Sequence, residues 1–321
     1  MLDLNLLQHE FPQDEGLCYL NHAAVAPWPA RTAEAVRRFA EENISKGAKD
    51  YANWLTTEKQ LRKQLQSLIH APSINDIALL KNTSEGISIV ACGIDWRPGE
   101  NIVSSNEEFP SNRIPWEAQQ DKGVEFRKVA IQVDDPEQAL IDACDENTRL
   151  LTISSVQYAT GRRMDLVRLG KHCTENNILF CVDAIQSLGA LEMDAQAIHA
   201  DFMMADGHKW MLGPEGIALF FCTETAREHL TLNQYGWHMV EKYGDYDTKE
   251  WTPASSARKF ECGSNNLMGI HALSASLSLF EDVGMGNVEQ QVLGNSIYLM
   301  ECLKQHRQIQ FLSPVGTGEY A

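Results

Sequence analysis

Polar and charged side chains stand directly after several short apolar runs of the sequence. Asp183 follows one such run, and Lys209 lies 26 residues later, close behind another, with one helix-plus-strand unit expected between them. Thr83 and Ser84 follow a third run and precede a helical stretch, and Phe109 follows a fourth. In open α/β sheets the carboxyl ends of parallel strands meet at one edge, where ligands bind. If these runs are strands, a carboxylate, an amine, two hydroxyls and an aromatic ring converge on one site.

This set of side chains has the chemistry that pyridoxal 5'-phosphate (PLP) requires. The aldehyde of PLP needs a lysine amine, for which Lys209 is the candidate. Its ring nitrogen needs an anionic partner, for which Asp183 is the candidate. Its phosphate needs N–H donors, which the start of a helix at Thr83 supplies. Its flat ring needs an apolar or aromatic face.

The elements that would position these residues alternate along the chain. Apolar runs without polar alternation are typical of parallel strands that are covered on both faces. The predicted strands are 77–80, 101–104, 124–129, 150–154, 178–182, 202–205 and 217–221. The predicted helices begin near residue 29 and then cover 57–69, 85–92, 112–120, 136–144, 166–175, 266–283 and 287–305. The alternation predicts an α/β fold with a mostly parallel central sheet.

Composition and charge exclude several classes of function. The chain has 321 residues, with 27 Lys+Arg against 44 Asp+Glu and a net charge of −17. This balance argues against a nucleic-acid binder and against a surface drawn to anionic lipid. No apolar run of 18 residues is present, and the first 16 residues do not resemble a signal peptide. The eight cysteines have no zinc-site spacing, so we expect no metal, reduced thiols and a cytoplasmic protein.

The longer context of the candidate residues resembles a known family. The segments 181–189 and 206–216 look like the signature of the class V aminotransferase family, which includes cysteine desulfurases, kynureninases and epimerases. The resemblance runs from about Tyr19 to the end of the chain. It implies the PLP-dependent transferase fold type I, PLP as cofactor, a small amino acid as substrate and a homodimer.

Carried over residue by residue, the resemblance implies a role for each candidate. The cofactor contacts it implies are Lys209 for the internal aldimine and proton transfer at Cα, Asp183 for the pyridinium, Gln186 for the phenolic oxygen, Phe109 for ring stacking, and Thr83, Ser84, Asp206 and His208 on the phosphate side. Ser264 resembles the position that reaches the phosphate of the neighbouring subunit. Asn21 and His22 resemble residues on the substrate side, and Gln157 lies in a kynureninase-like stretch near the cofactor.

Some positions depart from the family pattern. Asp206 stands where family members often have serine, and a carboxylate near a phosphate is unfavourable unless it is protonated or turned away. Phe109 stands where desulfurases carry histidine and kynureninases carry phenylalanine. The sequence stops before the region where the family supplies an arginine for the substrate carboxylate and where desulfurases place a sulfur-accepting cysteine. Cys302 is the last cysteine, on a predicted helix.

The domain organisation follows from the same comparison. We expect a large PLP-binding domain at 16–255 and a smaller α+β domain at 1–15 and 256–321, whose C-terminal part looks incomplete. The run 309–312 is predicted to be a single strand, which cannot complete a sheet by itself. Residues 234–257 are polar and aromatic without a clear period, so we expect a functional or interface loop there.

The leading function is a PLP enzyme of the class V aminotransferase and cysteine desulfurase type. Phe109 and the Gln157 stretch keep a kynureninase-like hydrolase as an alternative. A catalytically weak PLP-fold protein with a binding or regulatory role is a second alternative. A nucleotide-binding α/β protein is disfavoured, because no glycine-rich phosphate motif follows the first predicted strand.

Overall fold

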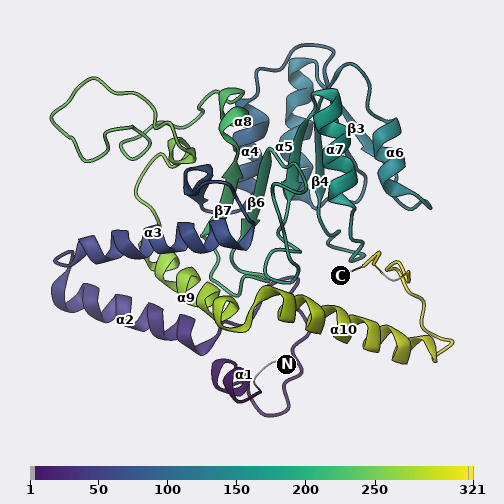
Figure 1. Cartoon of the computed structure of the whole chain (residues 1–321), viewed down its shortest axis with the longest axis horizontal. Coiled ribbons are helices and arrows are strands. Elements are labelled where there is room, and N and C mark those ends of the chain that lie inside the picture. Colours follow the sequence, from purple (N-terminus) through teal and green to yellow (C-terminus); the bar gives the residue numbers. More distant parts are fainter. Residues whose placement is uncertain (1–3, 317, 321) are drawn as a thin grey trace.

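The chain is organised around one seven-stranded sheet with helices on both faces (Figure 1). The structure is a computed structural model, and it describes residues 4–316 and 318–320. Residues 1–3, 317 and 321, which belong to the predicted small domain, lie outside this description. The strand order is β1-β7-β6-β5-β4-β2-β3. β7 is antiparallel to both of its neighbours, and the other pairs are parallel. The predicted fold class, a mostly parallel sheet covered by helices, is confirmed.

The strands closely match the apolar runs of the sequence. They are β1 (Ile77–Leu80), β2 (Asn101–Ser105), β3 (Glu125–Val129), β4 (Thr148–Ser154), β5 (Leu179–Asp183), β6 (Phe202–Asp206) and β7 (Ala218–Cys222). The α-helices are α1 (Leu4–Glu10), α2 (Ala30–Lys46), α3 (Tyr51–Leu68), α4 (Thr83–Gly93), α5 (Ile114–Glu117), α6 (Pro136–Asp142), α7 (Leu166–Asn176), α8 (Glu224–Glu228), α9 (Leu267–Val283) and α10 (Met285–Lys304). Four short 3-10 turns complete the described elements: η1 (Ile74–Asp76), η2 (Pro110–Asn112), η3 (Ala118–Lys122) and η4 (Ala257–Phe260).

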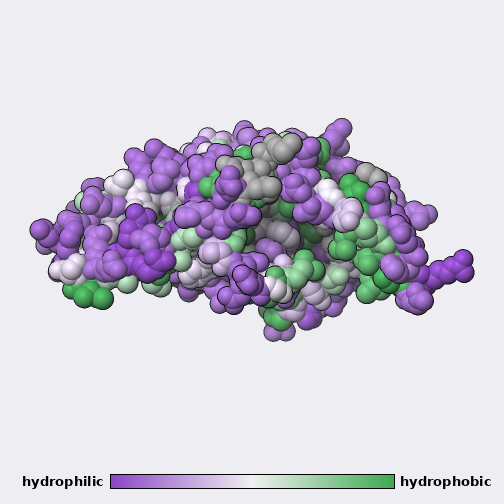
Figure 2. Space-filling model, turned by 90° about the horizontal axis from the view of Figure 1, so that it is seen from below, coloured by the Kyte–Doolittle hydropathy of each residue, from purple (hydrophilic) through white to green (hydrophobic). Residues whose placement is uncertain are grey.

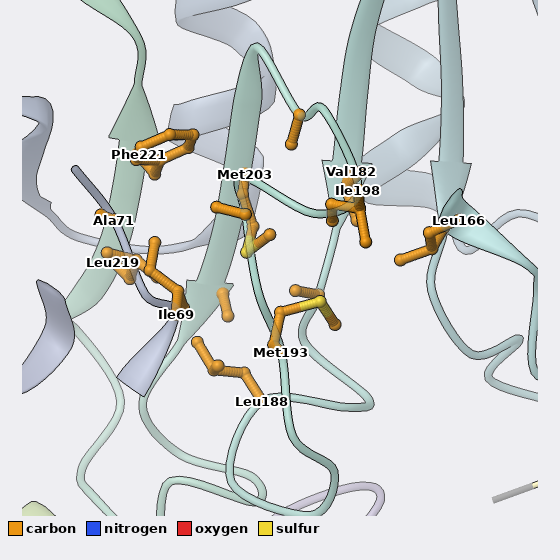
Figure 3. Packing of buried hydrophobic residues seen from close by; sticks show 14 of the residues in the cluster. Ile69, Ala71, Leu166, Val182, Leu188, Met193, Ile198, Met203, Leu219 and Phe221 are labelled. Carbon is orange, nitrogen blue, oxygen red and sulfur yellow. The ribbon is translucent and has the colours of Figure 1, made fainter. Parts of the chain in front are cut away.

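Alternate residues of each central strand enter different cores, which explains why the strands read as continuous apolar runs. Val182 and Met203 belong to the core beneath α3, α7 and α9, and Figure 3 shows them pointing to the same side of the sheet as Phe221. Their neighbours Cys181 and Met204 belong to the opposite core, beneath α4 and α5. Both faces are buried, so neither face selects polar residues.

Three expectations about local structure are wrong. Residues 309–312 form no strand: Leu312 is 80% exposed, and the described chain brings no strand beside it. The predicted helix 112–120 is instead the succession η2, α5 and η3, which contains Pro110 and Pro115. The connection between β5 and β6 is a series of turns rather than a helix, with Gly189 at a φ of +100°.

The surface adds two observations. No described helix is long and apolar enough to cross a membrane. Seen from the side of α1 and α10, the surface is mostly hydrophilic, with hydrophobic side chains gathered toward the end where α10 finishes (Figure 2). The second half of α10 exposes Ile297, Tyr298 and Leu299. The predicted division into two domains stays a prediction.

Candidate active site

Asp183 and Lys209 lie at the carboxyl ends of adjacent parallel strands. Asp183 is the last residue of β5, paired in register with Met204 of β6, and Lys209 follows β6 by three residues. The Asp183 side chain is buried, and its Oδ1 accepts one hydrogen bond, from the Ile185 N–H at 3.1 Å. Burial raises the pKa of Asp183 to about 7, and the nearby charge of Glu108 acts in the same direction. The Lys209 charge opposes this shift.

Lys209 is a buried amine in a tightly fixed turn. Burial lowers the pKa of Lys209, and the charges of Asp183 and Asp206 only partly offset that effect. The turn is closed by the Gly213 N–H bonding to the Gly207 carbonyl at 2.8 Å. Gly189 packs against this turn so closely that an added Cβ would lie 2.2 Å from the Trp210 carbonyl oxygen. These backbone contacts therefore fix the position of the turn that carries Lys209.

The start of α4 meets the end of β6 through a buried hydroxyl. The Asp206 N–H donates to Thr83 Oγ1 at 3.0 Å. Asp206 Oδ1 and His208 Nδ1 lie 3.1 Å apart, yet neither atom has a hydrogen-bond partner among the described residues. The first amides of an α-helix lack intrahelical partners, so α4 offers donors beside these two orphaned atoms. The free amides and the His208 ring suit an anion that is bound at the start of α4, whereas the Asp206 carboxylate disfavours one unless it is protonated or turned away.

Phe109 lies over the lysine from the turn between β2 and η2. The Lys209 Nζ is 5.7 Å from the centre of the Phe109 ring. The ring is 42% exposed, and it makes an edge contact with Tyr158 at 5.1 Å between centroids. Ser84 Oγ is 2.7 Å from Ser111 Oγ, which ties the start of α4 to the turn that carries Phe109. An aromatic face and the α4 hydroxyls thus lie on one side of the amine.

The N-terminal segment 19–26 packs onto the other side of the lysine turn. The Ala26 N–H donates to the His208 carbonyl at 2.9 Å, and the His22 ring stacks on Trp210 at 5.7 Å. Burial lowers the pKa of His22. Gln186 links the N-terminal segment to the lysine turn. Its Nε2 donates to the Ala23 carbonyl at 3.0 Å, and its Oε1 accepts from Trp210 Nε1 at 3.1 Å. The Asn21 side chain is exposed and makes no contact within the described chain that fixes it.

Gln157 is buried beyond the end of β4, where it donates to the carboxylate of Glu108 at 2.8 Å. Glu108 is a buried residue for which sequence reasoning assigned no role. A lone glutamate after a strand carries no sequence signal of burial, and only its position beside Phe109 pointed to this place in the fold.

Ser264 is exposed, and its segment lines a cavity of about 250 Å³ together with Lys81 and Glu85, which flank Thr83 and Ser84 at the start of α4. The segment is anchored by Glu261, which accepts two hydrogen bonds from Arg62, at 2.6 and 2.7 Å. Burial alone would raise the pKa of Glu261, but the Arg62 charge lowers it.

The same buried cluster contains Glu58 and His238. Potential ligand atoms of Glu58, His238 and Glu261 lie within 4.8 Å of one another, which is close enough for a metal site. Arg62 already donates to Glu58 at 2.6 Å as well as to Glu261. The Arg62 guanidinium therefore pairs with both carboxylates at the place where a metal ion would otherwise bind.

These residues fit PLP on their own chemistry. Asp183 is a buried carboxylate with one short backbone donor, which leaves it capacity to pair with a ring N–H. Lys209 is a buried amine to which no described residue forms a hydrogen bond, and Asp206 and His208 present orphaned polar atoms beside the start of α4. Lys209, Asp183, Phe109 and the α4 start would hold the aldehyde side, the ring nitrogen, the ring face and the phosphate.

The comparisons with known proteins agree with this geometry. The family model for Aminotransferase class-V matches residues 18–319. A probable cysteine desulfurase of Methanothermobacter thermautotrophicus is 34% identical, over 85% of this chain and 68% of its own. A probable cysteine desulfurase of Pyrococcus abyssi is 27% identical, over 89% and 72%.

Two solved structures share the fold. The apo cysteine desulfurase of Thermococcus onnurineus matches with a TM-score of 0.86 and 23% identity, over 100% of this chain and 81% of its own. A lysine mutant of C-DES, with glycine covalently linked to PLP, matches with a TM-score of 0.89 and 21% identity, over 98% and 84%. The predicted family is confirmed. The chain belongs to the aminotransferase class-V family of PLP-dependent enzymes.

Proposed function

We propose that this chain uses PLP at Lys209 to act on a small amino acid, in the manner of a cysteine desulfurase. The observation that carries the proposal is the pairing of a buried amine with a buried, weakly hydrogen-bonded carboxylate on adjacent strand ends, Lys209 and Asp183. The names of the relatives favour cysteine among small amino acids, because the matched proteins from two archaea are called probable cysteine desulfurases.

Lys209, Asp183 and Phe109 each make a different chemical contribution at the proposed site. When bound, PLP supplies an aldehyde that links to amines and a ring that draws electrons from the amino-acid Cα. Lys209 offers an amine whose lowered pKa increases its neutral fraction near pH 7, which suits both attachment and proton transfer at Cα. Asp183 offers the negative charge that keeps the ring nitrogen protonated. Phe109 offers an apolar face that excludes water from one side.

A direct assay follows from desulfurase chemistry. The C–S bond of cysteine breaks, the sulfur passes to an acceptor thiol, and alanine is released. The purified protein, loaded with PLP and supplied with dithiothreitol as acceptor, should form alanine and sulfide in equal amounts. The Lys209→Ala variant, loaded in the same way, is the control that should form neither. Equal rates in both proteins would contradict the assignment of Lys209.

A second candidate function is kynureninase-like hydrolysis. The observation in its favour is the edge contact between the exposed rings of Phe109 and Tyr158, which forms an aromatic wall beside Lys209. An aromatic wall suits the aryl group of kynurenine. Release of anthranilate from kynurenine, without alanine from cysteine, would select this function. Turnover of neither substrate would favour a PLP-binding protein with a regulatory role.

We also propose that two copies of the chain share their sites through Ser264. The support is that Ser264 is exposed at the cavity beside the start of α4, while Arg62 and Glu261 anchor its segment. If Ser264 serves the partner's phosphate, mixing inactive Lys209→Ala with weakened Ser264→Ala should restore activity through mixed dimers. A mixture no more active than its Ser264→Ala component would contradict this sharing.

A further inference from the structure

Glu108 is the most heavily hydrogen-bonded buried carboxylate near the site. It accepts from Ser105 Oγ at 2.8 Å, from Asn112 Nδ2 at 2.8 Å and from Gln157 Nε2 at 2.8 Å. The Ser154 N–H and hydroxyl donate to it as well. Its donors come from the end of β2, from η2, from the end of β4 and from the turn beyond β4. One carboxylate thus joins the segments that border the site on this side.

Such a carboxylate sets the orientation of the Gln157 amide. A carboxylate that is surrounded by donors can only accept, so the NH2 group of Gln157 must face Glu108. The amide oxygen is then directed away from Glu108. Gln157 is 1% exposed, and its Oε1 has no hydrogen-bond partner among the described residues. A buried acceptor without a donor costs free energy, which a ligand donor would recover.

Gln157 and Glu108 stand close to the residues proposed to hold PLP. Gln157 follows β4 by three residues, and Ser154 at the end of β4 is in register with Asp183. Glu108 precedes Phe109, whose ring faces the Lys209 amine. The charge of Glu108 also acts on Asp183 directly. The orphaned oxygen therefore lies at the sheet edge that carries the lysine and the aspartate.

We propose that Glu108 is a positioning residue that fixes the Gln157 amide so that its oxygen accepts a hydrogen bond from the N–H on the α-nitrogen of the bound amino acid. This inference rests on the proposed function, because it requires an amino-acid substrate at Lys209. Glu108 acts only through Gln157, and Gln157 touches the substrate. The pair selects ligands that carry an N–H donor over ligands of the same shape that lack one.

The first test separates the amino group from the rest of the substrate. The protein loaded with PLP is titrated with glycine, followed by cofactor absorbance, and 3-mercaptopropionate, which is cysteine without its amino group, is measured as an inhibitor. Gln157→Met should weaken glycine binding by ~10-fold, as expected for one lost hydrogen bond to a charged group, and should leave 3-mercaptopropionate binding unchanged. Equal weakening of both ligands would overturn the proposal. Glycine binding requires no turnover, so this result is independent of whether cysteine is a substrate.

The second test asks whether Glu108 acts through Gln157. Glu108→Gln should weaken glycine binding by ~10-fold in the native background and by less than about threefold in the Gln157→Met background. The dissociation constant of PLP should stay within about threefold of the native value. Glu137→Gln is the matched control, since Glu137 is also buried but lies at the start of α6 and accepts from the N–H of Asp165, which precedes α7. Equal effects of Glu108→Gln in both backgrounds would reduce Glu108 to a structural role and overturn the proposal. If Glu108→Gln does not fold, the Gln157→Met titrations alone decide whether the amide oxygen receives the amino group.

Discussion

Replacing Asp183 with asparagine should change how the stability of the PLP-free protein depends on pH. Asp183 is buried, and its pKa is raised by burial from 3.8 to about 7. Between these two values the carboxyl is protonated in the folded chain and ionised in the unfolded chain. The folded state then binds more protons, so stability falls as pH rises from about 4 to about 7 and levels off above that. Asparagine carries no titrating group and removes this dependence.

The size of the effect follows from the two pKa values. A shift from 3.8 to about 7 corresponds to a total loss of ~4 kcal/mol in the free energy of unfolding at high pH. Between pH 5.5 and pH 8 the part contributed by Asp183 is ~2 kcal/mol. Lys209 acts in the opposite direction, because its lowered pKa adds stability as pH rises from its folded value to 10.5. Native protein and the Asp183→Asn variant both contain Lys209, so the difference between the two proteins reports on Asp183.

The assay is urea unfolding of native and Asp183→Asn protein without PLP, at pH 5.5 and pH 8. Asparagine can still accept from the Ile185 N–H, but its buried NH2 group lowers stability by a similar amount at both pH values. The informative quantity is therefore the change between the two pH values. Native protein should lose ~2 kcal/mol more than the variant. Equal losses in both proteins would refute the assignment of a raised Asp183 pKa.

Three further substitutions test other parts of the site. Lys209→Ala should abolish the absorbance band of PLP linked to the chain and the covalent labelling of this site by PLP and borohydride, because among the described residues Lys209 is the amine that acts on Asp183. Gly189→Ala should cost ~2–4 kcal/mol of unfolding free energy and weaken PLP binding, since its Cβ would lie 2.2 Å from the Trp210 carbonyl and φ is +100°. Arg62→Met should cost ~3–5 kcal/mol in urea unfolding, because it leaves the buried Glu261 carboxylate unpaired.

Each of these substitutions has a matched control in the chain. Lys171→Ala removes an exposed lysine of α7 and should leave PLP labelling unchanged. Gly294→Ala lies in the interior of α10 with open space around it and should stabilise the protein by ~0.5–1 kcal/mol. Arg168→Met breaks an exposed ion pair with Asp135 and should cost at most ~1 kcal/mol. A control that behaves like its partner would mean that burial and close packing do not explain the larger effect.

The sequence predicted the structure best at the central strands, because a strand that is buried on both faces appears as a continuous apolar run. Strands such as β5 and β6 are apolar on both faces, and their ends are marked by Asp183 and Asp206. The placement of Lys209 beside Asp183 could therefore be predicted from strand ends alone. The family resemblance added the individual roles, and the structure brings most of those residues together.

The sequence was least informative where contacts distant in the chain decide the outcome. The connection between β5 and β6 was expected to contain a helix, but Gly189 must approach the Trp210 carbonyl too closely for any side chain. Turns such as the one at Asp194, whose carboxylate caps two amides, take the place of that helix. Residues 309–312 have a strand-like composition, but a strand needs a partner, and none of the described strands lies beside them.

Two buried carboxylates at the same sheet edge, Glu108 and Asp183, differ in how many hydrogen bonds they accept from the protein. This difference indicates which of them supports the fold and which is available to a ligand. Glu108 accepts hydrogen bonds from four residues, so its charge is satisfied within the chain. Asp183 accepts one, and burial raises its pKa to about 7. A buried acid that the fold leaves unsatisfied lowers stability unless something else supplies a donor or a cation. The fold thus keeps Glu108 for its own architecture and leaves Asp183 available for the ring nitrogen of a cofactor.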